Sequence, residues 1–218
     1  AVRDGNHWVL SGTKQFITSG READLAIVFA VTDPAAGKKG ITAFVVPTKS
    51  EGYKVASVEN KLGQRASDTC QIVFEDVHLT PDLMLGEEGQ GFTIAMDFFE
   101  ASRPQVAASA LGVARAAFEY ATEYARERTA FGRPLISKQA VSFKLAEMAM
   151  EIEAARLVTW RACTAVDAGE DAGLLGSYAK ALAADAAMRA ATDAVQILGG
   201  AGIMTDHPVE KWFRDAKV

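Results

Sequence analysis

Two stretches near the end of the chain, QILGG at residues 196–200 and PVEKWFRDAK at residues 208–217, decide how the sequence is interpreted. An alanine-rich segment with a helical period leads directly into Gly199 and Gly200. Glycine has no side chain and reaches positive φ, so such a pair ends a helix and lets a phosphate group or a flat ring approach the backbone. The pattern predicts a helix that ends in a cofactor-binding turn. The chain stops at Val218 without a terminating signal, and we expect it to be part of a longer enzyme.

The composition is that of a folded protein with one or two domains. Hydrophobic residues make up 49% of the 218 residues and charged residues 23%, which excludes a disordered chain. The formal net charge of −5 describes a mildly acidic, mixed surface, which gives no electrostatic reason to expect a nucleic-acid partner. The apolar run at 25–31 has the length of a strand, and no run is long enough to span a bilayer.

Several kinds of chemistry find no support in the sequence. Cys70 and Cys163 lie far apart and show no C-x-x-C spacing, which favours two reduced thiols in a cytosol-like compartment. The three histidines have no ligand spacing with one another or with the cysteines, so we expect no metal site. The chain also lacks a G-x-G-x-x-G fingerprint, a Walker loop and a G-x-S-x-G elbow.

The two parts of the chain have different periods. Up to about residue 85, turn signals separate short β-rich runs at 8–10, 16–18, 25–31, 41–46, 53–58 and 71–77. Strands at this spacing predict a small antiparallel sandwich or barrel. From Gly91 the apolar residues follow a helical period, which predicts long helices at about 91–127, 137–168 and 174–198. We therefore predict an α+β chain with a β-domain at 1–88 and a C-terminal α-helical up-down bundle at 89–218.

Three helices leave one apolar face of the predicted bundle without a partner. Their alanine content permits close helix–helix approach, so a bundle is the natural packing. We expect the remaining face to be covered by a fourth helix outside this sequence, by another subunit, or by both.

Two polar stretches of the β-rich part could carry chemistry. GTKQFITSG at 12–20 offers hydroxyls, free N–H groups and the ring of Phe16, which suit a flavin, although by itself it is more typical of an ordinary hairpin. In KLGQRASDT at 61–69, Arg65 and Asp68 could pair across a turn, and such a pair is commonly structural.

Two further stretches lie in the helical part. In FEASRP at 99–104, Pro104 is expected to kink a helix, and the polar residues before it form either a patch inside the bundle or a solvated face. In ERTAFGRP at 127–134, Arg128 could bind a pyrophosphate and Phe131 could lie against an adenine. The cations there could equally complement the helix dipole. Gln139 follows as a further polar candidate.

The order of these motifs along the chain is more specific than any single motif. GTKQFITSG (12–20), GQRASDT (63–69), SRP (102–104), ERTAFG (127–132), QILGG (196–200) and RDAK (214–217) together resemble the acyl-CoA dehydrogenase family over essentially all 218 residues. The resemblance implies a flavoenzyme that oxidises acyl-CoA thioesters to 2-enoyl-CoA. In that family an N-terminal helical domain, a middle β-domain and a C-terminal helical bundle enclose FAD. This chain would be the second domain and most of the third, with the N-terminal helical domain absent.

The resemblance also assigns site residues by motif. Phe16 and Thr18 would lie at the flavin ring, with Thr18 hydrogen-bonding near N5. The FAD diphosphate and adenine would be bound, largely across a subunit interface of a homotetramer, by Arg128, Phe131, Gln139, Gln196 and Gly200. Glu100 and Arg103 would lie along the acyl-CoA channel. Relatives often carry Trp in place of Phe16 and Gln in place of Ala130, so the ring contact would be smaller here and one polar contact would be lost.

The implied reaction needs a base that removes the α-proton of the thioester while hydride leaves Cβ for flavin N5. The α-C–H is weakly acidic, so its carbonyl must be polarised and the base carboxylate desolvated. In most relatives the base is a Glu shortly after the RDAK motif, which would lie past Val218. In a minority it occupies the position of Ser102, whose hydroxyl cannot serve. No catalytic residue is nominated in this chain, and by itself the chain is expected to be inactive.

The resemblance implies an acyl-CoA substrate, electron-transfer flavoprotein as the electron acceptor, and a homo-oligomer built as a dimer of dimers. It implies no membrane insertion, and a bacterial cytoplasm or a mitochondrial matrix as the location. One alternative is an acyl-CoA oxidase or flavin monooxygenase of the same fold, which oxygen consumption with peroxide release would indicate. The other is a non-catalytic module that only self-associates, which an absence of FAD binding would indicate.

Overall fold

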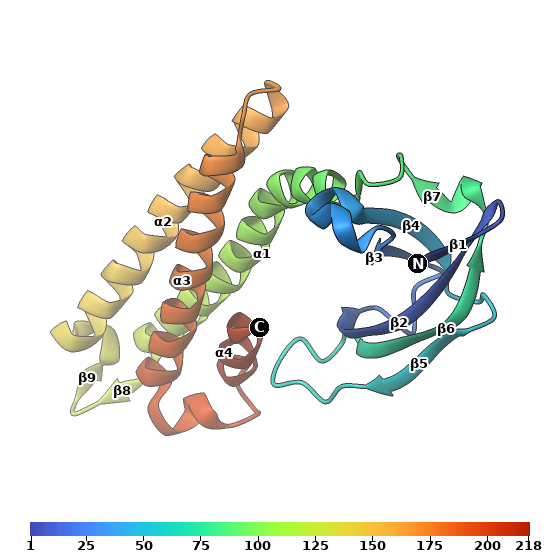
Figure 1. Ribbon diagram of the computed structural model, residues 1–218. Coiled ribbons are helices and arrows are strands. Elements are labelled where there is room, and N and C mark those ends of the chain that lie inside the picture. Colours follow the sequence, from blue (N-terminus) through green and yellow to red (C-terminus); the bar gives the residue numbers. More distant parts are fainter. The chain divides into compact units, whose positions relative to one another are not determined.

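The computed structural model describes all residues from Ala1 to Val218, and they form two compact units. A β unit comprises Ala1–Lys61 and Arg65–Phe98, and a helical unit comprises Leu62–Gln64 and Phe99–Val218 (Figure 1). The predicted division at residues 88 and 89 differs from this one because the first helix starts within the β unit, and the division stays a proposal.

The β unit consists of two antiparallel sheets. The four-stranded sheet has the order β1 (Val2–Asp4), β2 (His7–Thr18), β6 (Thr69–Leu79) and β5 (Tyr53–Val58). The three-stranded sheet has the order β3 (Leu25–Val31), β4 (Ile41–Pro47) and β7 (Met84–Leu85). No strand of one sheet pairs with a strand of the other, so the predicted antiparallel fold is confirmed as two sheets without a closed barrel. Short 3₁₀ helices lie at Pro34–Gly40 and Pro81–Leu83.

The core of the β unit follows from the alternation of side chains along its strands. In β3, Val28 and Ala30 are buried while Ile27 and Val31 are exposed, as expected of a strand with one face on a core. Residues from both sheets make up this core: Trp8, Leu10, Val28, Ala30, Phe44, Val46, Cys70, Ile72, Phe74, Val77 and Leu79. Trp8 and Phe44 pack edge to face across it, with ring centroids 5.9 Å apart.

The long strand β2 joins two runs that the sequence had predicted as separate strands. Its pairing with β6 is irregular twice, between Leu10 and Gly12 and between Lys14 and Ile17. At the second irregularity Phe16 adopts φ 58°, in the left-handed region that residues other than glycine rarely enter. Such bulges bend a strand and redirect a side chain. The second bulge therefore determines where Phe16 points.

The helical unit contains the three long helices that the sequence predicts, and this prediction is confirmed. They are α1 (Gly91–Glu127), α2 (Gln139–Asp167) and α3 (Gly173–Leu198), of which α1 begins in the β unit. Pro104 lies inside α1, and the helix continues through it. A two-stranded hairpin, β8 (Thr129–Ala130) and β9 (Arg133–Pro134), joins α1 to α2, with a 3₁₀ turn at Leu135–Ser137 after it.

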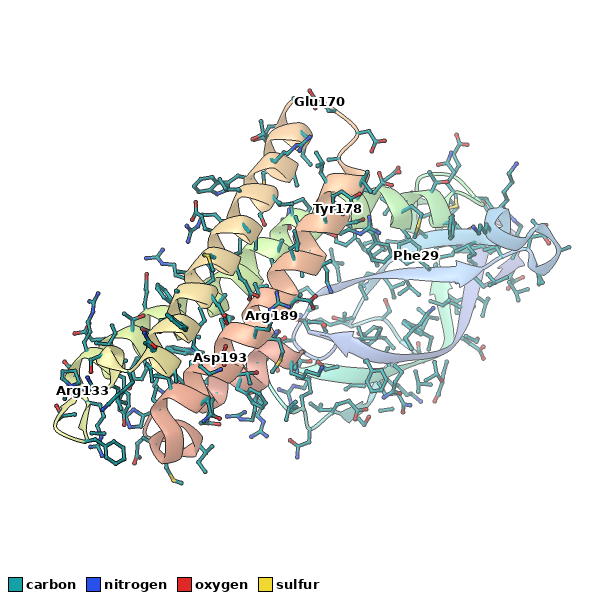
Figure 2. All side chains as sticks on the ribbon, turned by 90° about the vertical axis from the view of Figure 1, so that its left-hand side faces the viewer. Phe29, Arg133, Glu170, Tyr178, Arg189 and Asp193 are labelled. Carbon is teal, nitrogen blue, oxygen red and sulfur yellow. The ribbon has the colours of Figure 1, made fainter.

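Helices α2 and α3 run antiparallel. Lys144 Nζ lies 2.6 Å from Asp193 Oδ1, and Arg189 Nε lies 2.8 Å from Glu151 Oε2, so early residues of α2 face late residues of α3. Figure 2 shows Arg189 and Asp193 on α3, with Glu170 in the turn that joins the two helices. Buried alanines of α1 and α3 allow close packing, and none of them is more than 1% exposed: Ala114, Ala117, Ala121, Ala187, Ala190 and Ala194. None of the helices has the length and apolarity that crossing a membrane requires.

A short fourth helix, α4 (Val209–Lys217), follows a 3₁₀ turn at Gly199–Ile203 and closes the helical unit. The hydroxyl of Tyr120 on α1 lies 2.8 Å from Nδ1 of His207, just before α4, and the Tyr120 ring packs edge to face on Trp212. The sequence did not predict α4 because its nine residues span only about two and a half helical turns.

Candidate functional site

The predicted flavin-ring residues lie at one corner of the β unit, where β2 ends. The side chain of Phe16 is 71% exposed although it is aromatic and strained at φ 58°. Two residues later the Thr18 hydroxyl is exposed and makes no hydrogen bond within the chain, while the Thr18 backbone pairs with Thr69. The corner therefore offers a free aromatic face and a free hydroxyl donor within one short segment.

The turn that follows Thr18 is held by several hydrogen bonds. Ser19, at φ 57°, donates its N–H to the backbone oxygen of Asp68 at 3.0 Å. The Arg21 N–H donates to Asp68 Oδ2 at 2.9 Å, and the Tyr53 hydroxyl donates to the Gly20 carbonyl at 2.9 Å. These bonds fix a turn that a plain hairpin would leave to solvent.

The predicted pairing of Arg65 with Asp68 is wrong. Arg65 Nε donates to the Lys61 carbonyl at 2.8 Å, whereas the Asp68 carboxylate accepts from the Arg21 N–H and from Cys70 Sγ. The Arg21 N–H, followed by the Cys70 thiol, holds the pKa of Asp68 below its ordinary value. Burial, followed by the hydrogen bond to Asp68, raises the pKa of the Cys70 thiol. Burial and coulombic repulsion from Cys70 and Asp68 likewise raise the pKa of Tyr53.

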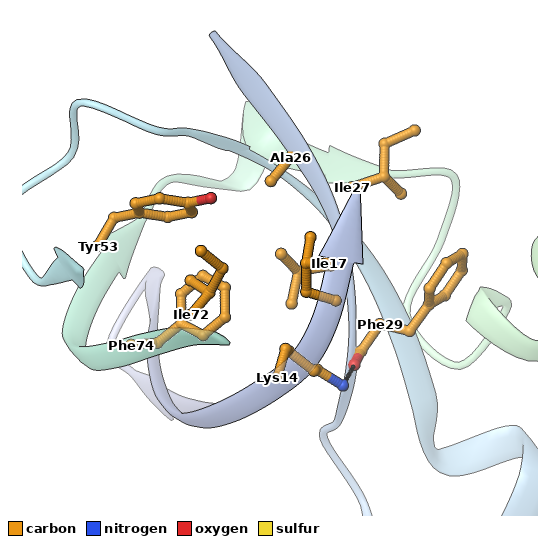
Figure 3. Close-up of a pocket in the computed structure, with 9 residues that line it drawn as sticks. Lys14, Ile17, Ala26, Ile27, Phe29, Tyr53, Ile72 and Phe74 are labelled. Carbon is orange, nitrogen blue, oxygen red and sulfur yellow. Dashed lines mark hydrogen bonds between the residues drawn. The ribbon is translucent and has the colours of Figure 1, made fainter. Parts of the chain in front are cut away.

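A crevice of about 230 Å³ opens between the two sheets of the β unit (Figure 3). Its walls are mainly apolar, and the Lys14 ammonium donates to the Phe29 carbonyl at 2.9 Å. No pattern in the sequence indicates this crevice, because its lining comes from four different strands: Lys14, Ile17, Ala26, Ile27, Val28, Phe29, Tyr53, Ile72 and Phe74.

The predicted adenine and diphosphate residues of the helical unit begin at the β8–β9 hairpin. Phe131 and Gly132 have φ 54° and 79°, the two positive values of a type I′ turn. At this tip the Phe131 side chain is 95% exposed, and Lys138 Nζ lies 5.5 Å from its ring centroid. Arg128, just before the hairpin, is exposed and forms neither an ion pair nor a side-chain hydrogen bond. The hairpin thus presents an aromatic ring and an unpaired guanidinium to its surroundings.

Gln139, Gln196 and Gly200 lie at the same end of the helical unit as this hairpin. Gln139 begins α2 and Gln196 lies in the last turn of α3, and the antiparallel packing of these helices brings the two ends together. Figure 2 shows Arg133 of the hairpin at one end of the helical unit and Glu170 at the other. Gly199 adopts φ 62°, as the sequence predicted of this turn, and a Cβ added at Gly199 or Gly200 would meet nothing within 4 Å.

The predicted substrate residues Glu100 and Arg103 lie at the other end of α3. A Cβ added at Gly173 would lie 3.4 Å from the Glu100 carboxyl, and one at Gly176 would lie 3.5 Å from Arg103 Cβ. Gly176 and Gln196 are separated by roughly 30 Å along the axis of α3. The helical unit therefore holds its two sets of predicted residues far apart.

Each unit carries groups that suit one part of FAD. Thr18 offers a free donor and Phe16 a flat apolar face, which suit the heteroatom edge and the plane of a flavin. Arg128 is an unpaired cation suited to a diphosphate, and the open backbone at Gly199 and Gly200 leaves room for one. The residues present fit the cofactor. No group of three or more His, Cys, Asp or Glu side chains is placed to hold a metal ion.

The RDAK motif joins α4 to the loop at residues 62–64 of the helical unit. Arg214 Nη1 donates to the Leu62 carbonyl at 3.1 Å, and Asp215 Oδ1 accepts the Gln64 N–H at 2.6 Å. A Cβ added at Gly63 would lie 2.2 Å from the Arg214 carbonyl oxygen, so only glycine allows this approach. Burial of the Asp215 carboxyl opposes its ionisation, but hydrogen bonds from Lys211 and Gln64 outweigh burial and lower its pKa.

Two protein-family models match this chain, one in each part. Residues 1–77 match the model of the acyl-CoA dehydrogenase middle domain, and residues 89–218 match that of the acyl-CoA dehydrogenase C-terminal domain. The mitochondrial short-chain specific acyl-CoA dehydrogenase of Bos taurus is 46% identical over 218 residues, which is 100% of this chain and 53% of that protein. The chain spans about half the length of the curated relatives it matches.

Two solved structures are similar over nearly the whole chain. Butyryl-CoA dehydrogenase from Megasphaera elsdenii superimposes with a TM-score of 0.97 at 44% identity. The match covers 99% of this chain and 57% of the butyryl-CoA dehydrogenase chain. A chain in a structure described as the electron transferring flavoprotein of Acidaminococcus fermentans superimposes with a TM-score of 0.97 at 42% identity, with the same coverage of 99% and 57%.

Proposed function

The chain belongs to the acyl-CoA dehydrogenase family, and from that premise we propose that it serves the FAD-dependent α,β-dehydrogenation of an acyl-CoA thioester to a 2-enoyl-CoA. We also propose that its domains are residues 1–88 and 89–218. Relatives named for butyryl-CoA and for short-chain substrates favour a short acyl chain, and butyryl-CoA is the first substrate to test.

One observation supports this proposal above the others, namely that two aromatic side chains are both strained and exposed. Phe16 and Phe131 have φ 58° and 54°, and their side chains are 71% and 95% exposed. A left-handed conformation costs a residue with a Cβ roughly 1–2 kcal/mol, and an exposed ring recovers little of that cost by burial. Strained backbone of this kind is concentrated at functional sites, where the strained conformation places a side chain for binding although it does not stabilise the fold.

The proposed work of this chain is to bind and orient the cofactor. Bound FAD supplies the hydride acceptor of the reaction. Thr18 would donate its hydroxyl near flavin N5 and Phe16 would lie against the ring. Arg128 would pair with the diphosphate and Phe131 with the adenine, while Gln139, Gln196 and Gly200 complete that end of the site.

Glu100 and Arg103 are proposed to line the acyl-CoA channel. We assign no catalytic base among residues 1–218: Ser102 has a hydroxyl, which bonds the Phe99 carbonyl at 3.3 Å, and a hydroxyl is too weak a base. For this reason residues 1–218 alone are expected to give no turnover.

A homo-oligomer, proposed as a dimer of dimers, accounts for the apolar side chains on the outside of α2. Phe143, Met150 and Leu157 are spaced by seven residues and therefore share a face, and they are 61%, 65% and 54% exposed. Such a contiguous stripe marks an interaction site on a folded protein. One chain holds the proposed cofactor residues near Gln196 and the proposed substrate residues near Glu100 at opposite ends of α3. A second subunit could place its cofactor residues near the substrate residues of the first.

Electron-transfer flavoprotein is the proposed acceptor, supported by the family and by the solved structure whose description names that protein. The two free cysteines and the mitochondrial relative favour a reducing location, either a bacterial cytoplasm or a mitochondrial matrix.

Substitution of Phe131 separates cofactor binding from folding. Asn-Gly is the preferred dipeptide of a type I′ turn, so Phe131→Asn should stabilise the hairpin by about 0.5–1 kcal/mol. Loss of the ring should at the same time weaken FAD binding about tenfold. Phe131→Tyr keeps the ring and should leave the affinity unchanged. Isothermal titration with FAD and urea unfolding measure the two effects, and an unchanged FAD affinity in Phe131→Asn would contradict the assignment.

The reaction itself is tested by anaerobic addition of butyryl-CoA to the FAD-loaded whole protein that contains residues 1–218, with residues 1–218 alone as the inactive control. Loss of the oxidised flavin absorption, followed by electron transfer to electron-transfer flavoprotein, is the expected result. Peroxide release in air at the rate of turnover would instead indicate an acyl-CoA oxidase.

A further inference from the structure

We propose that Asp68 is a positioning residue that fixes the Thr18 hydroxyl for the flavin through the turn at residues 18–21. This inference rests on the proposed function, because it concerns the orientation of a proposed cofactor contact. Asp68 lies 50 residues along the chain from Thr18 and was expected to pair with Arg65.

Asp68 holds the turn from two sides. Its backbone oxygen accepts the Ser19 N–H at 3.0 Å, and its Oδ2 accepts the Arg21 N–H at 2.9 Å. Ser19 and Arg21, the two residues after Thr18 in this turn that carry a side chain, are thus both bound by the residue that directly precedes β6. Since Ser19 is held at φ 57°, loss of these bonds would let it relax to an ordinary extended conformation.

The surroundings keep Asp68 itself in place. Cys70 Sγ lies 3.0 Å from Asp68 Oδ2 and donates its thiol hydrogen to the carboxylate. Gly20 packs against Cys70 so closely that an added Cβ would lie 2.9 Å from Cys70 Cβ. The turn therefore has one arrangement that satisfies Asp68, and Thr18 is the last residue of the strand that feeds into it.

Thr18 has no competing role that would explain this rigidity. Its hydroxyl is exposed and makes no hydrogen bond within the chain, so the fold gains nothing from its orientation. A hydrogen bond to a ligand, by contrast, requires a donor held within a few tenths of an ångström of its acceptor.

A double-mutant cycle with Thr18 tests the proposal, with FAD affinity as the readout. Thr18→Val should raise the FAD dissociation constant about tenfold, the equivalent of one hydrogen bond. Asp68→Ala should raise it about fivefold in the wild-type background and by less than about twofold in the Thr18→Val background, because its effect passes through Thr18. Asp68→Asn, which keeps an acceptor for the Arg21 N–H, is the milder variant should Asp68→Ala fold poorly, and a partial effect is expected.

Asp76 provides a matched control. It clamps the other irregularity of the same strand pair, where its Oδ1 accepts from Ser11 Oγ at 2.7 Å, and it has φ 50°. Asp76→Ala should destabilise the β unit at least as much as Asp68→Ala, yet leave the FAD dissociation constant unchanged. Amide exchange should show that Ser19 and Arg21 lose protection only in the Asp68 variant.

The outcomes are distinguishable. Equal effects of Asp68→Ala in both backgrounds, or loosened Ser19 and Arg21 amides with unchanged FAD affinity, would show a structural role only and overturn the proposal. A wild-type protein that takes up no FAD would refute the proposed function and this inference with it.

Discussion

Replacement of Gly63 by alanine tests whether the RDAK motif acts as a clamp. A Cβ at this position would lie 2.2 Å from the Arg214 carbonyl oxygen and 2.7 Å from the Asp215 nitrogen, both backbone atoms that cannot turn aside. An ordinary contact begins at 3.4 Å, so the loop and α4 must separate by about 1 Å. The hydrogen bond from Gln64 to Asp215, now 2.6 Å long, would then exceed the range in which it contributes.

The magnitude follows from the bonds that this separation breaks. The Gln64–Asp215 bond and the Arg214–Leu62 bond both involve a charged group, and such bonds contribute roughly 1.5–3 kcal/mol each. Because Leu62 and Gln64 are exposed and water replaces part of the loss, the lower end applies. We expect Gly63→Ala to lower the free energy of unfolding of the helical unit by about 3 kcal/mol, which corresponds to a melting temperature lower by about 6–12 °C.

Urea unfolding followed by far-UV circular dichroism measures this loss, and amide exchange should localise it to α4. Gly112→Ala is the control, since Gly112 lies inside α1 and an added Cβ meets nothing within 4 Å. Helix propensity predicts that this control stabilises the protein by about 1 kcal/mol. The same substitution should thus have opposite signs at the two sites. A change of less than about 0.5 kcal/mol in Gly63→Ala would refute the clamp.

Three further predictions concern the helical unit. Because the pKa of Asp215 is lowered, its contribution to stability is complete above the ordinary value of 3.8 and is lost as the pH falls through the folded-state pKa. Urea unfolding should therefore show a lower free energy of unfolding at about pH 2.5 than at about pH 4.5, and Asp215→Asn should reduce this difference. Tyr120→Phe removes the 2.8 Å bond to His207 and should cost about 1 kcal/mol in urea unfolding, and no cost would mean that the bond contributes nothing. Met150→Glu places a charge on the exposed stripe of α2 and should dissociate the oligomer in analytical ultracentrifugation while leaving stability within about 0.5 kcal/mol, whereas an intact oligomer would place the interface elsewhere.

Local patterns in the sequence determined the secondary structure and the family. The helical period predicted all three long helices within about two residues of their observed bounds. The reason is that the i to i+4 hydrogen bonds and the apolar face of a helix depend only on residues close in sequence. The turn at Gly199 was predicted for the same reason, since glycine reaches positive φ without the strain that a Cβ causes, and this preference is local. The motif order gave the acyl-CoA dehydrogenase family.

Tertiary structure alone decided which residues share a site and which only hold it. Asp68 binds the turn after Thr18 instead of Arg65, and Asp215 binds Gln64 across 151 residues of sequence. The separation of Glu100 from Gln196 depends on the packing of α1 beside the start of α3, which neither helix specifies by itself. The physical reason is the same in each case: hydrogen bonds and packing between distant segments depend on the relative placement of whole elements, and that placement is not encoded in any local period.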